Sequence, residues 1–321
     1  MRTVARWLVV ALLLLNVIAN ETKADTVKPV TVLGDQAFTE SITAGPDGTL
    51  YLSSIAMGGV QRIKPGADRA EQWIVPGTYE TRSTFGVYVD AKSSTLWVCS
   101  NDVSAFGIPG PGSVTGSHLV AFDLATGEGK SRYKLPGSAT LCNDMVLSDD
   151  GALYVTNTAA PQIFRLRPGA IELELFVEDA QMQPSKDPAI DGIAFGSDGN
   201  LYVNTYGLGE FFRVDVKNGK AGAVTKLTPS RPLKNPDGLR QLDGQTFLMV
   251  EAGAGTLDRV TVAGDKLTVE TLKDGLDGPA ALIKVGDTIW VAEGKHAHLF
   301  AAKENGPPKV PFHIVPVQLG K

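Results

Sequence analysis

The sequence predicts an all-β fold, a six-bladed β-propeller that follows an N-terminal signal peptide. A hairpin motif with an Asp-Gly turn recurs in residues 40–54, 143–157 and 191–205. The aromatic residue of its second strand recurs after steps of 46, 57, 48, 45 and 43 residues. A period in the forties with about four strands per repeat is typical of a propeller. The aligned aromatic residues are Tyr51, Trp97, Tyr154, Tyr202, Phe247 and Trp290.

The alternative architecture is an α/β barrel, which needs a helix after every strand. Beyond the N-terminus no long segment has helical periodicity, so we expect little helix. The 321 residues are 43% hydrophobic, which excludes a disordered chain. The net charge is −5 and no block of Lys or Arg occurs, which argues against a nucleic-acid partner.

Residues 1–24 are predicted to be a signal peptide. Arg2 and Arg6 precede an apolar run at 7–19, which is shorter than the roughly 20 residues of a membrane span. Small residues allow cleavage after Ala19 or Ala24. The alternative is an uncleaved N-terminal anchor. We expect a periplasmic or secreted protein with no stable membrane insertion after cleavage.

Residues 25–321 are predicted to form one propeller domain. Weaker copies of the hairpin occur at 85–100, 237–252 and 278–293, and third strands follow several hairpins. Fourth strands are less clear, with 70–75 and 172–177 the best candidates. Closing the ring removes open sheet edges. Residues 27–33, residues 311–319 or both are expected to close it, and the sequence does not decide between them.

Side chains that carry oxygen occupy equivalent positions in four of the repeats. Counting back 11 residues from each aligned aromatic, or 10 in the fifth repeat, reaches the start of the first strand. In a propeller this strand lines the central channel, so equivalent residues form a ring. Converging carboxylates repel each other unless a cation is present, and oxygen ligands suit Ca²⁺ first and Mg²⁺ or Mn²⁺ next. The alternative is that these residues only bind nearby backbone groups. The six positions are Glu40, Gly86, Asn143, Asp191, Asp237 and Pro279.

The repeat and the Glu/Asn/Asp/Asp ring resemble the superfamily of senescence marker protein, gluconolactonase and luciferin-regenerating enzyme. Similar rings occur in the diisopropylfluorophosphatase and paraoxonase propellers. The resemblance covers nearly the whole mature chain. It implies a six-bladed propeller with Ca²⁺ or another divalent ion on its axis, which hydrolyses lactones or related esters and phosphoesters.

The resemblance also implies roles for single residues. Glu40 in TESI and Asp237 in NPDGL resemble metal ligands of the family, and Asn143 in CND resembles a ligand of metal or substrate. Asp144 would be the structural partner of Asn143. Asp191 in IDGIAF stands where the family usually has Asn, and E-S-I replaces the usual E-G-P. The additional charge would tighten metal binding or make Asp191 a general base.

The predicted function is divalent-metal-dependent hydrolysis of a lactone or related ester, a small-molecule substrate, by a monomer. Asp191 and Asp144 are the predicted catalytic residues, which orient or deprotonate water. One alternative is a non-catalytic exported propeller that binds a small molecule or a protein. Another is a metal-assisted lyase on the same scaffold. A serine triad is not supported, because no G-x-S-x-G motif occurs and no His falls in the ring.

The second strand of each blade ends on the face where the first strand begins. Four residues near these ends are therefore candidates for substrate binding, namely Asn101, Asn157, Tyr206 and Glu251. Residues 101–117 form a Gly/Pro/Ser-rich insertion, which we expect to cover the channel mouth as a lid. The alternative is a passive surface loop.

The two cysteines are expected to lie close together. Cys99 ends the second strand of the second blade and Cys142 starts the first strand of the third, on the same face. Export permits oxidation, so the pair would form a disulfide. Two free buried thiols are the alternative.

Overall fold

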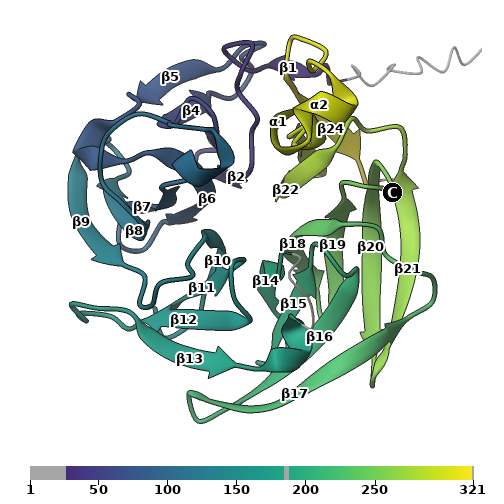
Figure 1. The fold of residues 1–321 in the computed structure, drawn as a ribbon. Coiled ribbons are helices and arrows are strands. Elements are labelled where there is room, and N and C mark those ends of the chain that lie inside the picture. The colour runs from purple at the N-terminus through teal and green to yellow at the C-terminus, as the bar shows by residue number, and fades with distance from the viewer. Residues whose placement is uncertain (1–26, 184–187, 320–321) are drawn as a thin grey trace, which may run out of the picture.

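The chain forms antiparallel sheets arranged around a central axis (Figure 1). The structure is a computed structural model, and it describes residues 27–183 and 188–319. The predicted signal peptide, residues 1–24, lies outside the described residues. Within the described part, the fold class follows the prediction: an all-β, propeller-like arrangement with little helix.

Three sheets each contain four consecutive antiparallel strands. The first has β2 (Ile42–Ala44), β3 (Leu50–Ser53), β4 (Val60–Ile63) and β5 (Glu71–Ile74). The second has β6 (Ser83–Asp90), β7 (Thr95–Asn101), β8 (Ser117–Asp123) and β9 (Gly129–Lys134). The third has β10 (Cys142–Leu147), β11 (Leu153–Asn157), β12 (Gln162–Leu166) and β13 (Glu174–Glu178).

The next eight strands form a single sheet in the order β14-β15-β16-β17-β21-β20-β19-β18. One half has β14 (Ile190–Phe195), β15 (Leu201–Thr205), β16 (Glu210–Lys217) and β17 (Lys220–Pro229). The other has β18 (Pro236–Asp243), β19 (Thr246–Glu251), β20 (Thr256–Ala263) and β21 (Lys266–Lys273). The long outer strands β17 and β21 pair in parallel at Thr228–Lys266 and Pro229–Leu267. The structure therefore shows four separate four-stranded sheets and one joined sheet, where the sequence predicts six separate blades.

The last sheet contains both ends of the described chain. It has β22 (Pro279–Val285), β23 (Thr288–Glu293) and β24 (His313–Gln318), with β1 (Val30–Thr31) on the outside. β1 pairs with β24 at Val30–Ile314 and Thr31–His313. Of the closures that the sequence left open, the structure uses both terminal segments together.

Helices are few and short in the described residues. They are α1 (Ala297–Phe300), α2 (Ala302–Asn305) and the 3₁₀ turns η1 (Thr78–Glu80), η2 (Ser104–Phe106) and η3 (Ala180–Met182). Within the described part of the chain, no helix has the length and apolar character needed to cross a membrane.

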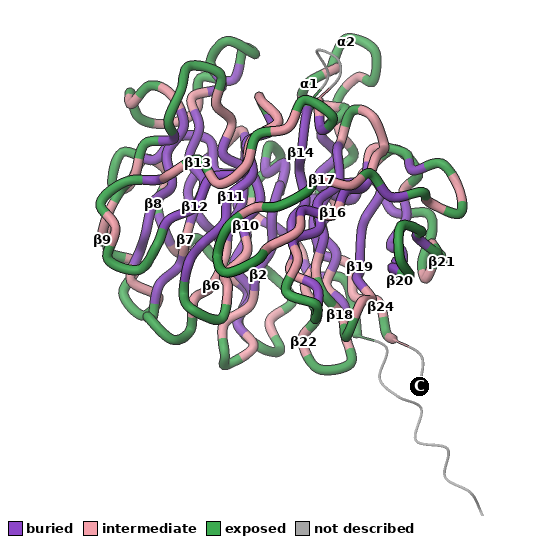
Figure 2. Tube along the Cα trace, turned by 90° about the horizontal axis from the view of Figure 1, so that it is seen from below, coloured by how far each residue is buried: buried purple, intermediate pink, exposed green. Residues whose placement is uncertain are grey.

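The first strand of each four-stranded unit lies innermost, and these strands contact one another in a closed ring from β2 through β22. Buried residues follow these strands through the centre of the molecule (Figure 2). The approach of neighbouring inner strands is so close that glycine is required. A Cβ at Gly86 would lie 1.8 Å from the carbonyl oxygen of Asn143, and one at Gly192 would lie 2.4 Å from that of Asp237.

We predict that Gly86→Ala is destabilised by about 3 kcal/mol or more, because the backbone of β10 must move to admit the methyl group. Urea denaturation measures the effect. The matched control is Gly222→Ala in the outer strand β17, where the nearest atom to the added Cβ is a side-chain carbon at 3.1 Å. Equal unfolding midpoints for the two variants would contradict this packing argument.

Candidate metal centre

The start of the inner strands is irregular at the level where the predicted ring lies. Five of the six inner strands shift register there against their second strands, for example between Cys142 and Met145 in β10 and between Ile190 and Ile193 in β14. β-Bulges redirect side chains next to active sites. Here consecutive residues, Asn143 and Asp144, both face the axis.

The predicted ring residues meet around one small cavity on the axis. Its volume is about 10 Å³, close to the smallest that holds a single water-sized body. Each of its acidic and amide side chains is at most 7% exposed. The sixth inner strand contributes Ala280 and Ala281 in place of the predicted Pro279. The polar lining residues are Glu40, Ser41, Asn143, Asp144, Asp191, Asp237 and Arg240.

Four of these side chains are joined by hydrogen bonds within the ring. The carboxyl group of Asp191 interacts with the carboxyl group of Asp237 and with the amide of Asn143. The carboxyl group of Glu40 also interacts with Asn143. The orientation of Asn143 is set by Thr158: Asn143 Nδ2 donates to Thr158 Oγ1 at 3.0 Å, and this hydroxyl donates to the carbonyl of Ile190 at 2.8 Å.

Asp144 is engaged differently from the other ring carboxylates. Arg240 binds it with both terminal nitrogens, at 2.6 Å and 3.0 Å. The backbone amides of Met145 and Ile193 also donate to it, at 2.9 Å and 3.3 Å. Four donors therefore hold the Asp144 carboxylate in one orientation, while the catalytic role that the sequence predicts for it stays a prediction. Arg240 itself was not predicted, although it lies only three residues after Asp237.

His296 is a second residue that the sequence analysis missed. It lies just after β23, and its Nδ1 is 3.2 Å from Glu40 Oε2. Donor atoms of Glu40, Asp237 and His296 lie within 4.8 Å of one another. His296 lies six residues after the aligned aromatic Trp290, whereas Asn101 and Tyr206 lie four residues after theirs, so counting along the repeat does not find it.

Burial and mutual repulsion raise the pKa of the ring carboxyls. Burial, and then the charge of Asp144, raises the pKa of Asp191 to about 7. Burial followed by the charge of Asp191 holds the pKa values of Glu40 and Asp237 well above their ordinary values. Burial also lowers the pKa of His296 to about 4, so its imidazole is neutral at pH 7. Arg240 is therefore the positive charge that lines this cavity.

This donor set fits a divalent cation. Three buried carboxyls, Glu40, Asp191 and Asp237, remain after Arg240 has paired with Asp144. They share a space one ion wide with the amide of Asn143. Ser41 also lines it, and among the described residues Ser41 Oγ has no hydrogen-bond partner. Hard oxygen donors of this kind suit Ca²⁺, Mg²⁺ or Mn²⁺.

Of the four predicted substrate-binding residues, Tyr206 is the one whose pKa is affected by the charges of three ring carboxyls. Burial, and then the charges of Asp237, Asp191 and Glu40, raises the pKa of its phenol, which stays protonated at neutral pH. A protonated phenol beside the carboxyls is available as a hydrogen-bond donor to a ligand.

The other three have partners within the protein. Asn101 donates to the carbonyl of Cys142 at 2.8 Å and accepts from its amide at 2.9 Å. Asn157 accepts from the amide of Leu141 at 2.8 Å and donates to the carbonyl of Ala139 at 2.9 Å. Glu251 is fully buried and pairs with Arg231 at 2.6 Å. These contacts hold the three side chains in place within the protein, and substrate binding by them stays a prediction.

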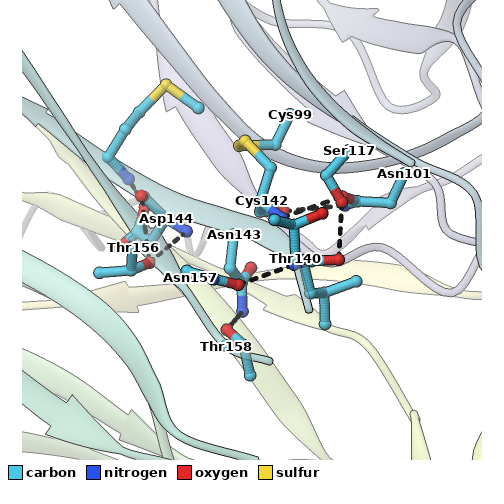
Figure 3. Close-up of a disulfide and its surroundings, with 12 residues drawn as sticks. Cys99, Asn101, Ser117, Thr140, Cys142, Asn143, Asp144, Thr156, Asn157 and Thr158 are labelled. Carbon is cyan, nitrogen blue, oxygen red and sulfur yellow. Dashed lines mark hydrogen bonds between the residues drawn. A yellow bond between two sulfur atoms is a disulfide. The ribbon is translucent and has the colours of Figure 1, made fainter. Parts of the chain in front are cut away.

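Cys99 and Cys142 form a disulfide, with Cα atoms 5.2 Å apart. Figure 3 shows this bond directly beside Asn143 and Asp144, among the hydrogen bonds of Asn101 and Thr156. It joins β7 of the second sheet to β10 of the third. The disulfide therefore anchors the strand that carries two of the ring residues.

A larger cavity, of about 840 Å³, opens at the opposite end of the axis. It is lined by the far ends of the inner strands, including Leu147 and Ile283. None of Glu40, Asn143, Asp191 or Asp237 lines it, whereas Arg240 borders both cavities. Size alone therefore does not mark the candidate centre, which is identified by its chemistry.

Solved structures with the same kind of fold include enzymes of several classes. Luciferin-regenerating enzyme superposes with a TM-score of 0.65 at 12% identity, covering 91% of this chain and 93% of that one. A gluconolactonase from Xanthomonas campestris gives 0.59 at 15%, with 92% and 96% covered. Virginiamycin B lyase from Staphylococcus aureus, in a catalytically inactive form with quinupristin, gives 0.59 at 17%, with 88% and 80% covered. No family model and no curated protein matches the chain. At these identities the likeness shows the propeller fold.

We predict that the metal-free protein loses stability as the pH rises from about 4 to about 7. In this window the folded state keeps the proton of Asp191, with its pKa of about 7, whereas the unfolded chain releases it near 3.8. The urea midpoint in chelator should thus be lower at pH 8 than at pH 5, and Asp191→Asn should reduce the difference. Equal midpoints at the two pH values in the unmodified protein would show that the ring is not strained by its charge.

We predict that removing the disulfide in Cys99→Ala/Cys142→Ala costs about 4 kcal/mol of unfolding free energy, given its sequence separation of 43 residues. The same variant should bind Ca²⁺ more weakly in calorimetric titration, because Asn143 follows Cys142. Ser148→Ala in the distant turn after β10 serves as the control. An unchanged Ca²⁺ affinity in the double variant would show that the disulfide does not influence metal binding by the ring.

Proposed function

We propose that the protein is an exported, divalent-metal-dependent hydrolase that acts on a lactone or related ester, as gluconolactonase does. The observation that carries the proposal is the cluster of buried carboxyls around a cavity one ion wide. The fold it shares with gluconolactonase and luciferin-regenerating enzyme supports the same reading. We count six blades, because each half of the eight-stranded sheet repeats the four-strand order and supplies one inner strand.

Glu40, Asn143, Asp191 and Asp237 would hold the ion, with Ca²⁺ the first candidate and Mg²⁺ or Mn²⁺ the next. A bound divalent ion polarises the carbonyl oxygen of the ester and stabilises the negative charge that develops there. The enclosed position, at most 7% exposed for each ligand, strengthens these electrostatic interactions. It also restricts the site to substrate groups that reach it from the open face.

The residues around the ion would provide proton transfer, positioning and substrate binding. Asp191, the additional carboxylate of the ring, would accept a proton from the attacking water. Arg240 holds Asp144, and Asp144 binds the amide of Ile193 close to Asp191, which fixes the backbone that carries the base. The protonated phenol of Tyr206 would donate a hydrogen bond to the substrate. The neutral imidazole of His296 would orient Glu40.

A lyase is the second candidate function, and His296 is the observation that favours it. Its neutral imidazole lies beside the ring and would abstract a proton from carbon. One solved lyase with this fold is described as catalytically inactive when a histidine is replaced by alanine. The two reactions differ in their products, since hydrolysis adds oxygen from water and elimination does not. A propeller that binds a small molecule or a protein without turnover is the third candidate.

We further propose a periplasmic or secreted location and a monomer. The disulfide agrees with an oxidising compartment. The sheet that contains both ends of the described chain closes the ring, so no inner strand needs a second copy as its partner.

We predict about one Ca²⁺, Mg²⁺ or Mn²⁺ per chain in the purified mature protein, and none in Asp237→Ala. Elemental analysis measures the content, and a panel of lactones and esters measures the activity. Hydrolysis should fall by more than about a hundredfold in Asp237→Ala, since the charge-stabilising ion is lost. Asp243→Ala, an exposed position on the same strand, is the matched control and should behave as the unmodified protein.

Absence of metal from the unmodified protein, with no thermal stabilisation by added divalent ions, would overturn the hydrolase proposal. Metal without turnover on the whole panel would favour a binding function. Turnover in ¹⁸O-labelled water that leaves the products unlabelled would favour the lyase.

A further inference from the structure

Two exposed phenylalanine rings meet on the open face of the candidate centre. Phe106 lies in η2 of the insertion and is 68% exposed, and Phe300 ends α1 and is 49% exposed. Their ring centroids are 6.1 Å apart, in an edge-to-face arrangement. They come from elements that are far apart in the sequence. The contact therefore connects the insertion after the second sheet's β7 with the helical segment after β23.

The insertion is anchored to the rest of the protein on both sides of Phe106, whose side chain is exposed. Two of its apolar side chains, Val103 and Ile108, are buried in the core at 2% and 7% exposure. Arg82 pairs with Asp102 at 3.1 Å and donates to backbone carbonyls further along the insertion. The loop is anchored at several points, and Phe106 is its exposed large hydrophobic side chain, which differs from a passive loop.

Phe300 is linked to the ring by direct contacts. The preceding residue, Leu299, packs against the core, while Phe300 contacts His296 with centroids 6.3 Å apart. His296 in turn lies 3.2 Å from Glu40. In Figure 1, α1 lies close to the axis near β2 and β22. The aromatic pair is therefore continuous with the side of the ring that Glu40 forms.

The chemistry of the pair points to a neutral apolar ligand group. Adjacent exposed aromatic rings indicate an interaction site, whereas apolar residues scattered singly need no explanation. Two side chains are far smaller than the area that a stable protein interface requires. The two phenyl rings carry no charge and no hydrogen-bonding group, so they match an alkyl or aryl group and not a charged one.

We propose that Phe106 and Phe300 form an apolar subsite at the entrance, which binds an alkyl or aryl substituent of the substrate. This inference rests on the proposed function and names its substrate class. The substrate is a lactone or ester with an apolar substituent, and its carbonyl reaches the ring while the substituent lies against the two rings. Small polar sugar lactones lack this contact.

The kinetic test uses γ-lactones with unbranched alkyl substituents of increasing length on the metal-loaded protein. We expect kcat/KM to rise roughly threefold per added methylene group over the first few, somewhat below the fourfold of complete burial. In Phe106→Ala/Phe300→Ala this increase should be lost, while kcat/KM for unsubstituted γ-butyrolactone stays within about twofold. Ile171→Ala, which removes a side chain of a residue 91% exposed elsewhere, should keep the increase.

A binding test distinguishes failure of this inference from failure of the proposed function. The neutral probe N-phenyl-1-naphthylamine should show enhanced fluorescence with the unmodified protein and with Ile171→Ala. The double phenylalanine variant should bind it at least about tenfold more weakly. This readout needs no turnover, so it decides on the subsite even if no lactone is hydrolysed.

Two results would overturn the subsite. One is that the double phenylalanine variant shows the same increase of kcat/KM with alkyl chain length, or the same affinity for the probe, as the unmodified protein. The other is a dimer, detected by light scattering, that Phe106→Glu converts to monomer, because the pair would then be an interface between copies. Circular dichroism and the Ca²⁺ content of the double variant verify that it is folded with an intact ring.

Discussion

The repulsion between carboxyl groups on the axis is the constraint on which the rest of this structure depends. Asp144, Asp191 and Asp237 come from three different inner strands, Glu40 directly precedes a fourth, and the four share a space for about one ion. Arg240 compensates one charge. The remaining carboxyls must be protonated or must bind a cation. Their raised pKa values mean that protonation is favoured when no cation is bound. A fold that keeps such a cluster together must hold each strand firmly against its neighbours.

That hold is provided by polar side chains of the second strands, each of which bridges two neighbouring units. Thr156 accepts from the amide of Asp144 at 2.9 Å and donates to the carbonyl of Asp191 at 2.8 Å. Asn204 accepts from the amide of Gly192 at 3.0 Å and donates to the carbonyl of Asp237 at 2.6 Å. Asn101 binds both backbone groups of Cys142 in the same way, which the disulfide reinforces. Successive ring residues are thus fixed relative to one another through the backbone.

This network explains which features of the site were accessible from the sequence. The ring could be predicted because it is set by a count along a regular hairpin. Asn101 lies in the position expected for a ligand contact, yet its amide bonds stay within the protein, and no pattern distinguishes the two uses. Arg240 and Asp144 face the axis because of bulges, which break the strand period of two. His296 follows a strand by an irregular turn, where counting no longer applies.

Parts of the fold escaped prediction for a similar reason. The outer strands β17 and β21 have ten and eight residues, yet most of these residues are exposed or half-buried. Without a buried face they lack the apolar alternation that indicates a strand. Their parallel pairing, which joins two units into one sheet, is a contact between surfaces and leaves little trace in either segment.

The way the ring is closed has a consequence for how the molecule is made. β24 lies between β23 and β1, so the first strand of the described chain pairs within its sheet with the last strand. During synthesis the earlier units can form in order, but the final sheet stays incomplete until β24 has been made. The closing sheet thus makes completion of the fold depend on the synthesis of the last described strand.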